Sequence, residues 1–135
     1  MKIFVDTSAF LAMLVRDDQF HDLAKNEWTR IIDTDATMIS SNYIVVETIA
    51  LLQRRFGNDA VRLFTSDVQP LITLAWVDEK THESALNVVK TINQRILSLV
   101  DCTSFEIMRQ LGIEHVFSFD SHFSDQGFKV IPNNK

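Results

Sequence analysis

Residues 1–8 read Met-Lys-Ile-Phe-Val-Asp-Thr-Ser, a short apolar run that meets an acid and then two hydroxyl residues. An apolar run of this length without alternation is typical of a strand buried on both faces of a parallel sheet. Asp6 ends the run, and the apolar segment from Ser8 to Val15 that follows predicts a helix. The opening of the chain therefore predicts a buried strand and a helix with a carboxylate at their junction.

The same pattern of apolar runs and helical segments continues along the chain. The predicted strands are Lys2–Asp6, Thr37–Ser40, Leu71–Val77, His115–Phe119 and Lys129–Ile131. The predicted helices are Ser8–Val15, Asp22–Ile32, Asn42–Phe56, Asn58–Ser66, Lys80–Ile92 and about Cys102 to Leu111. Strands that alternate with helices predict an α/β fold with a central, mostly parallel five-stranded sheet and helices on both faces. In such sheets, sites form at the carboxyl ends of the strands, where the strand order reverses.

The length and composition limit the classes of protein to which the chain can belong. Its 135 residues fit one domain, residues 1–135. Cys102 is the single cysteine, which excludes an intramolecular disulfide and a cysteine-based zinc site. No segment reaches the roughly 18 uninterrupted apolar residues of a membrane span, and the N-terminus lacks the pattern of a signal peptide. We therefore expect a cytoplasmic protein with no membrane partner.

Four acids stand where apolar segments end or where apolar surface surrounds them. Asp6 and Asp120 end the first and fourth predicted strands, Glu47 lies inside the apolar helix Asn42–Phe56, and Asp101 follows an apolar run. Crowded carboxylates repel one another, and a divalent cation such as Mg²⁺ or Mn²⁺ removes that cost because both ions prefer oxygen ligands. A centre of this kind can polarise a phosphate and activate a water. The four acids are therefore candidate metal ligands and catalytic residues.

Each acid also has an ordinary structural interpretation, which the sequence leaves open. Asp6 and Asp101 can equally cap the helices that follow them. Glu47 can pair with the basic residues Arg54–Arg55 one or two turns later, and Asp120 can be a turn residue. The chain has eighteen acids, including these four, and a net charge of −5. A negative net charge by itself argues against a nucleic-acid partner. Neutralising these four with metal would bring the net charge to −1, so the charge does not decide the substrate.

Five motifs, in order along the chain, resemble those of PIN-domain proteins, and specifically toxin ribonucleases of the VapC type. They are Phe4–Phe10, Asp17–Ala24 with His21, Glu47, Leu97–Phe105 with Asp101, and Phe119–Phe123 followed by Gly127-Phe128. The resemblance covers nearly the whole chain. It implies hydrolysis of RNA phosphodiester bonds that depends on Mg²⁺ or Mn²⁺, with Asp6, Glu47, Asp101 and Asp120 as the metal site. It also implies homodimers and an antitoxin partner that blocks the carboxylates.

Several polar residues near these motifs are weaker candidates. Thr7 and Ser8 can support the site or cap the helix, and Ser118 stands where the family often has threonine. His122 can face the substrate or be an ordinary loop histidine, and Asp125 is a candidate outer acid or an exposed loop acid. The remaining weak candidates are His21, His82 and His115, which lack zinc-site spacing, and the basic group Arg54, Arg55 and Arg62, a candidate phosphate contact.

Two other functions remain open from the sequence. A PIN-like fold can be a non-catalytic binding module, but loss of one or more carboxylates would mark that case, and this chain has all four. A metal-dependent DNA nuclease would use the same residues, and no motif separates the two substrates. The chain is too short to add a DNA-binding module, which favours RNA.

Overall fold

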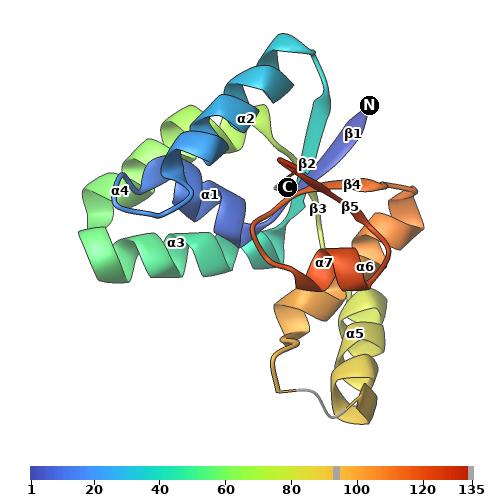
Figure 1. Cartoon of the computed structure of the whole chain (residues 1–135). Helices are drawn as coiled ribbons and strands as arrows, with labels where there is room; N and C mark the ends of the chain where they lie inside the picture. Colours follow the sequence, from blue (N-terminus) through green and yellow to red (C-terminus); the bar gives the residue numbers. More distant parts are fainter. Residues whose placement is uncertain (93–94, 134–135) are drawn as a thin grey trace.

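The computed structural model describes residues 1–92 and 95–133, which form a five-stranded sheet flanked by helices (Figure 1). The strands are β1 (Lys2–Val5), β2 (Thr37–Ser41), β3 (Thr73–Ala75), β4 (His115–Phe117) and β5 (Lys129–Ile131). They lie in the order β3-β2-β1-β4-β5, and every neighbouring pair is parallel. The predicted α/β fold with a five-stranded sheet is therefore confirmed, and the sheet is parallel throughout.

The helices cover the sheet in two groups. The first group is α1 (Thr7–Leu14), α2 (His21–Asp33), α3 (Asn42–Phe56) and α4 (Asn58–Leu63). The second group is α5 (Glu79–Ile92), α6 (Leu99–Leu111) and α7 (His122–Asp125). Right-handed crossovers that run from β1 to β3 place the first group on one face, and those that run from β3 to β5 place the second on the other. Figure 1 shows the two groups on opposite sides of the sheet, as predicted.

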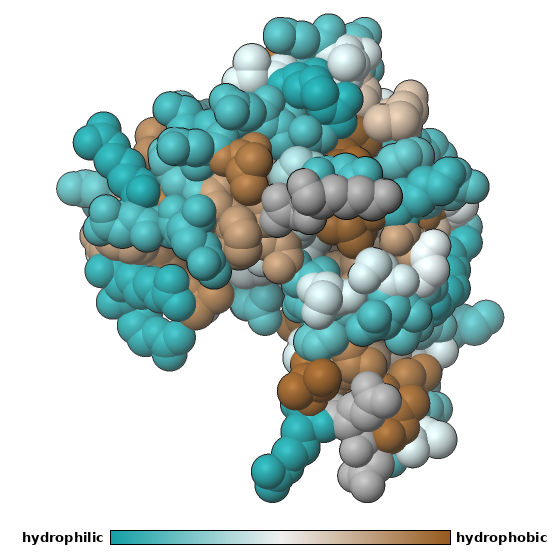
Figure 2. Space-filling model, viewed as in Figure 1, coloured by the Kyte–Doolittle hydropathy of each residue, from teal (hydrophilic) through white to brown (hydrophobic). Residues whose placement is uncertain are grey.

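The strand order reverses between β1 and β4. The chain leaves β1 toward β2 and β3 on one side, and it returns to β4 and β5 on the other. Val5 pairs with Phe117 in the register of this central pair, and both side chains are fully buried. Burying a side chain of this kind contributes roughly 1.5–3 kcal/mol, so the core holds the two carboxyl ends firmly together. Figure 2 shows the surface hollowed between the two groups of helices, on the side toward which β1 and β2 run.

The ends of several elements differ from the sequence prediction. β3 covers only three residues because a 3-10 turn, Gln69–Leu71, occupies the start of the predicted strand Leu71–Val77. A π-helical turn, Phe64–Val68, follows α4 where one continuous helix was expected. Helix α6 begins at Leu99 instead of near Cys102. Among the described residues, no helix is both long and apolar enough to cross a membrane.

Candidate metal centre

Asp6 lies at the carboxyl end of β1 and is the N-cap of α1. Its Oδ2 accepts hydrogen bonds from the Ser8 amide at 3.3 Å, the Ser8 hydroxyl at 2.7 Å and the Ser118 hydroxyl at 3.1 Å. The residue is only 6% exposed. Its backbone is extended, and its amide donates a hydrogen bond to the Phe117 carbonyl, so it continues the pairing of β1 with β4. The capping role considered from the sequence is therefore present, and it coexists with a buried carboxylate at the switch point of the sheet.

Two serine hydroxyls join the ends of β1 and β4 around this carboxylate. The Ser8 Oγ accepts a hydrogen bond from the Phe119 amide at 3.0 Å, and the Ser118 Oγ accepts one from the Asp120 amide at 3.0 Å. Each hydroxyl has the Asp6 carboxylate within donating distance, and the two hydroxyls lie 3.2 Å apart. The Thr7 Oγ1 is buried without a hydrogen-bond partner in the described part of the chain. Ser8 and Ser118 thus hydrogen-bond to Asp6 and Thr7 makes no such contact, and their supporting role in the site stays a prediction.

Asp101 reaches the same region from the first turn of α6 instead of from a position before the helix. The Ser98 hydroxyl accepts from the Asp101 amide at 3.1 Å, and the Asp101 Oδ2 accepts from the Ser98 amide at 3.1 Å. This reciprocal pair is a capping box, which satisfies two amides at the helix start. The spacing Ser98-x-x-Asp101 was a readable signal in the sequence, and it locates the start of the helix at Leu99.

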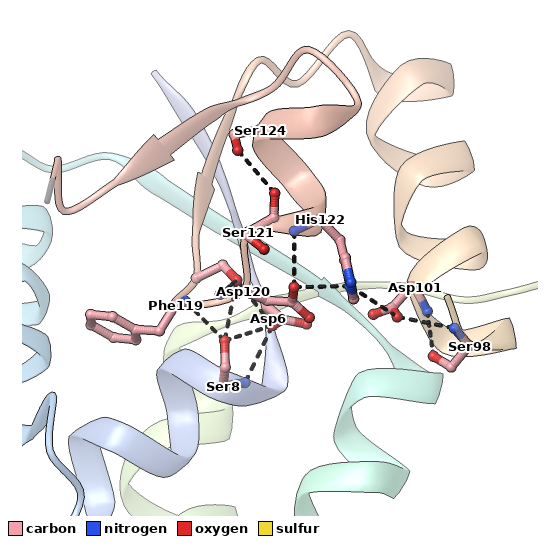
Figure 3. Close-up of polar contacts among 10 residues, drawn as sticks. Asp6, Ser8, Ser98, Asp101, Phe119, Asp120, Ser121, His122 and Ser124 are labelled. Atoms are coloured by element: carbon pink, nitrogen blue, oxygen red, sulfur yellow. Dashed lines mark hydrogen bonds and ion pairs between the residues drawn. The ribbon is translucent and has the colours of Figure 1, made fainter. Parts of the chain in front are cut away.

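Asp120 and His122 complete the cluster from the segment after β4 (Figure 3). The Asp120 Oδ1 accepts a hydrogen bond from the His122 amide at 2.9 Å. The His122 Nδ1 lies 2.9 Å from the same oxygen and 3.8 Å from the Asp101 Oδ2. Ligand atoms of Asp101, Asp120 and His122 all lie within 4.8 Å of one another. The start of α6 and the segment after β4 thus direct two acids and an imidazole to one point.

The electrostatics of the cluster are unfavourable without a cation. Burial raises the pKa of Asp6 to about 6 against the lowering effect of the Ser8 hydroxyl, and the negative charge of Asp101 raises it further. Burial also raises the pKa of Asp101 against the Ser98 hydrogen bonds, and the charge of Asp120 adds to this rise. These shifts mean that the ionised forms of Asp6 and Asp101 are destabilised by their surroundings. A bound divalent cation would reverse that effect.

Comparisons with known proteins agree with this geometry. The sequence pattern of the PIN domain matches residues 3–129. The chain belongs to the PIN-domain family. The 23S rRNA-specific endonuclease VapC20 of Mycobacterium tuberculosis is 34% identical over 127 residues, which are 93% of this chain and 95% of that protein.

Solved structures support the same assignment. The crystal structure of VapC20, described as a sarcin-ricin loop cleaving toxin, superposes on this PIN domain with a TM-score of 0.81 over 93% of this chain and 95% of that one. FitAcB from Neisseria gonorrhoeae shares the fold with a TM-score of 0.70, 16% identity and 96% coverage of both chains. Together, the family and VapC20 confirm the resemblance seen in the motifs and the predicted class of enzyme, a metal-dependent nuclease.

Glu47 of this PIN domain lies apart from the group of three ligands. It is half-buried on α3, which contacts α6, the helix that carries Asp101. Among the described residues it forms no ion pair, and Arg54 and Arg55 are exposed at the far end of α3. The pairing considered from the sequence is therefore absent there, and the role of Glu47 in the metal site stays a prediction.

The donor atoms of the cluster fit a hard divalent cation. Carboxylate oxygens of Asp6, Asp101 and Asp120 are the ligands that Mg²⁺ and Mn²⁺ prefer. The His122 Nδ1 is buried without a hydrogen-bond partner within residues 1–92 and 95–133, because its 2.9 Å approach to Asp120 lacks hydrogen-bond geometry. An unsatisfied nitrogen beside crowded carboxylates is the arrangement that a cation would complete.

The remaining candidates lie outside the cluster. The His21 Nδ1 contacts the Ala12 carbonyl at 2.8 Å, and Asp125 is exposed on α7. Arg62 pairs with Asp59 at 2.6 Å on the exposed surface of α4. Cys102 is buried on α6, and burial raises the pKa of its thiol, which fits a packing residue better than a nucleophile.

Proposed function

We propose that this PIN domain is an endoribonuclease that hydrolyses RNA phosphodiester bonds with Mg²⁺ or Mn²⁺ held by Asp6, Asp101 and Asp120, together with Glu47. One observation carries the proposal. Ligand atoms of Asp101, Asp120 and His122 lie within 4.8 Å of one another, the Asp6 carboxylate is near enough for the charge of Asp101 to raise its pKa, and the pKa of Asp101 is raised as well. Helix capping accounts for hydrogen bonds of Asp6 and Asp101 but not for the electrostatic cost of the group, which a bound cation would offset.

The chain's own groups would prepare the reaction by holding this cluster rigid. A bound divalent ion would polarise the phosphate and lower the pKa of a water that attacks it. Ser8 and Ser118 hold the Asp6 carboxylate, and Ser98 holds that of Asp101. Because these hydroxyls and amides fix the rotamers, the carboxylates need little reorganisation when the substrate arrives.

Structured ribosomal RNA is the substrate that we propose to test first. VapC20, which is 34% identical over nearly the whole chain, acts on 23S rRNA and cleaves its sarcin-ricin loop. We propose a stem-loop of this class for the present chain. The net charge of −5 does not oppose this, because the proposed ligands account for four of the acids and a divalent cation offsets part of their charge.

We further propose that the protein works in the cytoplasm and has two protein partners. A toxin that cleaves ribosomal RNA must be restrained in the cell that makes it, which supports an antitoxin peptide that blocks the carboxylates. Val46 and Trp76 are 66% and 74% exposed, and large apolar side chains at the surface support burial in a homodimer.

Cleavage of a sarcin-ricin stem-loop RNA by the purified protein tests the proposed function. We expect cleavage with Mg²⁺ or Mn²⁺ and none with EDTA, and loss of at least about a hundredfold in Asp101→Asn, since metal ligands carry the chemistry. Asp33→Asn changes an exposed acid at the end of α2, before β2 begins, and should cleave like the wild type.

Single-stranded and duplex DNA of the same sequence separate the alternatives. Cleavage of DNA but not RNA would replace the proposal with a DNA nuclease. Binding of RNA without cleavage in any metal, by protein that binds Mn²⁺, would overturn the catalytic proposal in favour of a binding module.

A further inference from the structure

The ring of His122 occupies a place that its hydrogen bonds do not explain. Figure 3 shows it directed between the carboxylates of Asp101 and Asp120. Its Nδ1 is buried and has no hydrogen-bond partner in the described residues, although it lies 2.9 Å from the Asp120 Oδ1. That oxygen already accepts a hydrogen bond from the His122 amide. The ring nitrogen is therefore close to two carboxylates without bonding well to either.

The two distances from this nitrogen lie in the range of ligand spacings around one ion. Ligands at about 2.1 Å from an octahedral ion lie about 3.0 Å apart when adjacent and about 4.2 Å apart when opposite. The His122 Nδ1 lies 2.9 Å from the Asp120 Oδ1 and 3.8 Å from the Asp101 Oδ2. The first value agrees with the adjacent spacing to about 0.1 Å, and the second lies between the two spacings, about 0.4 Å short of the opposite one. One ion can therefore contact all three atoms after side-chain movements of less than about 1 Å.

We propose that the Nδ1 of His122 is a direct metal ligand and that it shifts the preference of the site toward Mn²⁺ over Mg²⁺. The inference rests on the proposed function, because it assumes that the carboxylate cluster holds the catalytic ion. Mg²⁺ takes oxygen ligands almost exclusively, whereas imidazole nitrogen suits transition metals. A nitrogen in an otherwise carboxylate site therefore weakens the competition from Mg²⁺.

The other three histidines lie away from the carboxylates. His21 places its Nδ1 against the Ala12 carbonyl, and His82 places its Nδ1 against the Tyr43 hydroxyl. His115 begins β4, so it lies at the amino end of the parallel sheet, opposite the cluster. None of the three belongs to a group of candidate metal ligands among the described residues. His115→Gln is thus a matched control for His122→Gln.

Pulsed electron paramagnetic resonance of the Mn²⁺-loaded full chain tests the proposal directly. A coordinated imidazole couples its ¹⁴N nucleus to the Mn²⁺ electrons, and carboxylates do not. We expect this coupling in the wild type and in His115→Gln, and its loss in His122→Gln. In parallel, the Kd for Mn²⁺ should rise roughly tenfold or more in His122→Gln, and the Kd for Mg²⁺ should rise less.

The outcomes separate the ligand role from the metal site itself. Mn²⁺ that binds the wild type without ¹⁴N coupling would overturn the role of His122 and leave the proposed carboxylate site standing. Failure of the wild type to bind either Mn²⁺ or Mg²⁺ would overturn the proposed function together with this inference, and binding of Mg²⁺ without Mn²⁺ would overturn this inference alone. The wild-type spectrum shows whether an imidazole binds Mn²⁺ even if His122→Gln does not fold. His122→Asn is then a second variant in which to compare the Kd for Mn²⁺ with the Kd for Mg²⁺.

Discussion

Asp6 combines two roles that make opposite demands on its charge. As the N-cap of α1 it accepts hydrogen bonds, and as a buried acid beside Asp101 its ionised form is destabilised. Asparagine keeps the capping function and removes the charge, whereas alanine removes both. The two substitutions therefore separate the structural role of the residue from its electrostatic cost.

Asp6→Asn should stabilise the metal-free protein at pH 7.5 by about 1–3 kcal/mol, since a pKa displaced by about two units corresponds to roughly 3 kcal/mol. Asp6→Ala should stabilise less, because losing the N-cap costs about 1 kcal/mol. Urea unfolding in EDTA measures both free energies of unfolding. A metal-free Asp6→Asn protein that is less stable than the wild type would contradict the assignment of Asp6 as a strained carboxylate.

The raised pKa of Asp6 also predicts how stability depends on pH without metal. Its pKa rises from 3.8 to about 6 on folding, so between these values the folded state binds more protons than the unfolded state. The contribution of Asp6 to the free energy of unfolding therefore falls as the pH rises from 4 to 6 and is constant above. Comparing urea unfolding of wild type and Asp6→Asn across this window isolates the effect. A difference that does not change with pH would disprove it.

Glu47 is the residue whose role the geometry leaves to experiment. It is half-buried on α3 without an ion-pair partner in the described residues. If it binds the ion, Glu47→Gln should raise the Kd for Mn²⁺ roughly tenfold or more while the free energy of unfolding without metal changes by less than about 0.5 kcal/mol. Calorimetric titration and urea unfolding give the two values, with Asp33→Asn as the control. An unchanged Kd would remove Glu47 from the site.

At the scale of single elements, the capping box of α6 connects helix formation to the metal centre. Ser98→Ala should lower the free energy of unfolding by about 1 kcal/mol with little change in Mn²⁺ affinity, because the Asp101 carboxylate keeps the backbone amide of residue 98 as its donor. Ser66→Ala removes an exposed serine hydroxyl away from the cluster and should change neither value. A marked loss of Mn²⁺ affinity in Ser98→Ala would show that the hydroxyl cap also positions the Asp101 carboxylate.

The sequence predicted elements best where periodicity and a stop signal coincide. Helix α3 has the predicted bounds Asn42–Phe56 because an amphipathic pattern ends at Gly57, whose φ of 84° suits glycine. Helix α7 was missed because four residues carry too little periodicity to distinguish a helix from a turn. The predicted end of the first strand, Asp6, was one residue too late, because β1 ends at Val5 and Asp6 caps α1. The apolar pattern does not show where capping by a side chain begins.

The sequence predicted the acids of the candidate site but not the position of the His122 ring nitrogen. Asp6 and Asp120 could be placed together because parallel strands bring their carboxyl ends to one edge. Asp101 could be placed near them from the apolar run before it. The orientation of the His122 ring depends on the backbone after Asp120, which no pattern in the sequence specifies. Spacing thus predicts which elements meet, and side-chain direction requires the three-dimensional structure.

At the scale of the whole molecule, the topology explains why distant residues act together. Asp6 and Ser118 are 112 positions apart, yet their side chains are hydrogen-bonded because β1 and β4 are neighbours. The cluster is held by both groups of helices and by the centre of the sheet. A ligand at this point should therefore stabilise the protein as a whole instead of one segment.

Mn²⁺ should raise the Tm of the wild-type protein in a concentration-dependent way. At a hundred times the Kd, binding to the folded state alone contributes about 2.7 kcal/mol. Asp101→Asn should lose most of this gain, whereas Asp33→Asn should keep it. Scanning calorimetry over a series of Mn²⁺ concentrations measures the effect, and an equal rise in all three proteins would indicate binding elsewhere on the surface.

The proposed divalent metal site lies where the carboxyl ends of β1 and β4 meet the start of α6. The most direct measurement is an anomalous difference map from crystals of the wild-type protein grown with saturating Mn²⁺. We expect a Mn²⁺ peak in contact with Asp101, Asp120 and the Nδ1 of His122, with the Asp6 carboxylate beside it. An ordered peak elsewhere, or none in this cluster, would show that these residues do not form a divalent metal site.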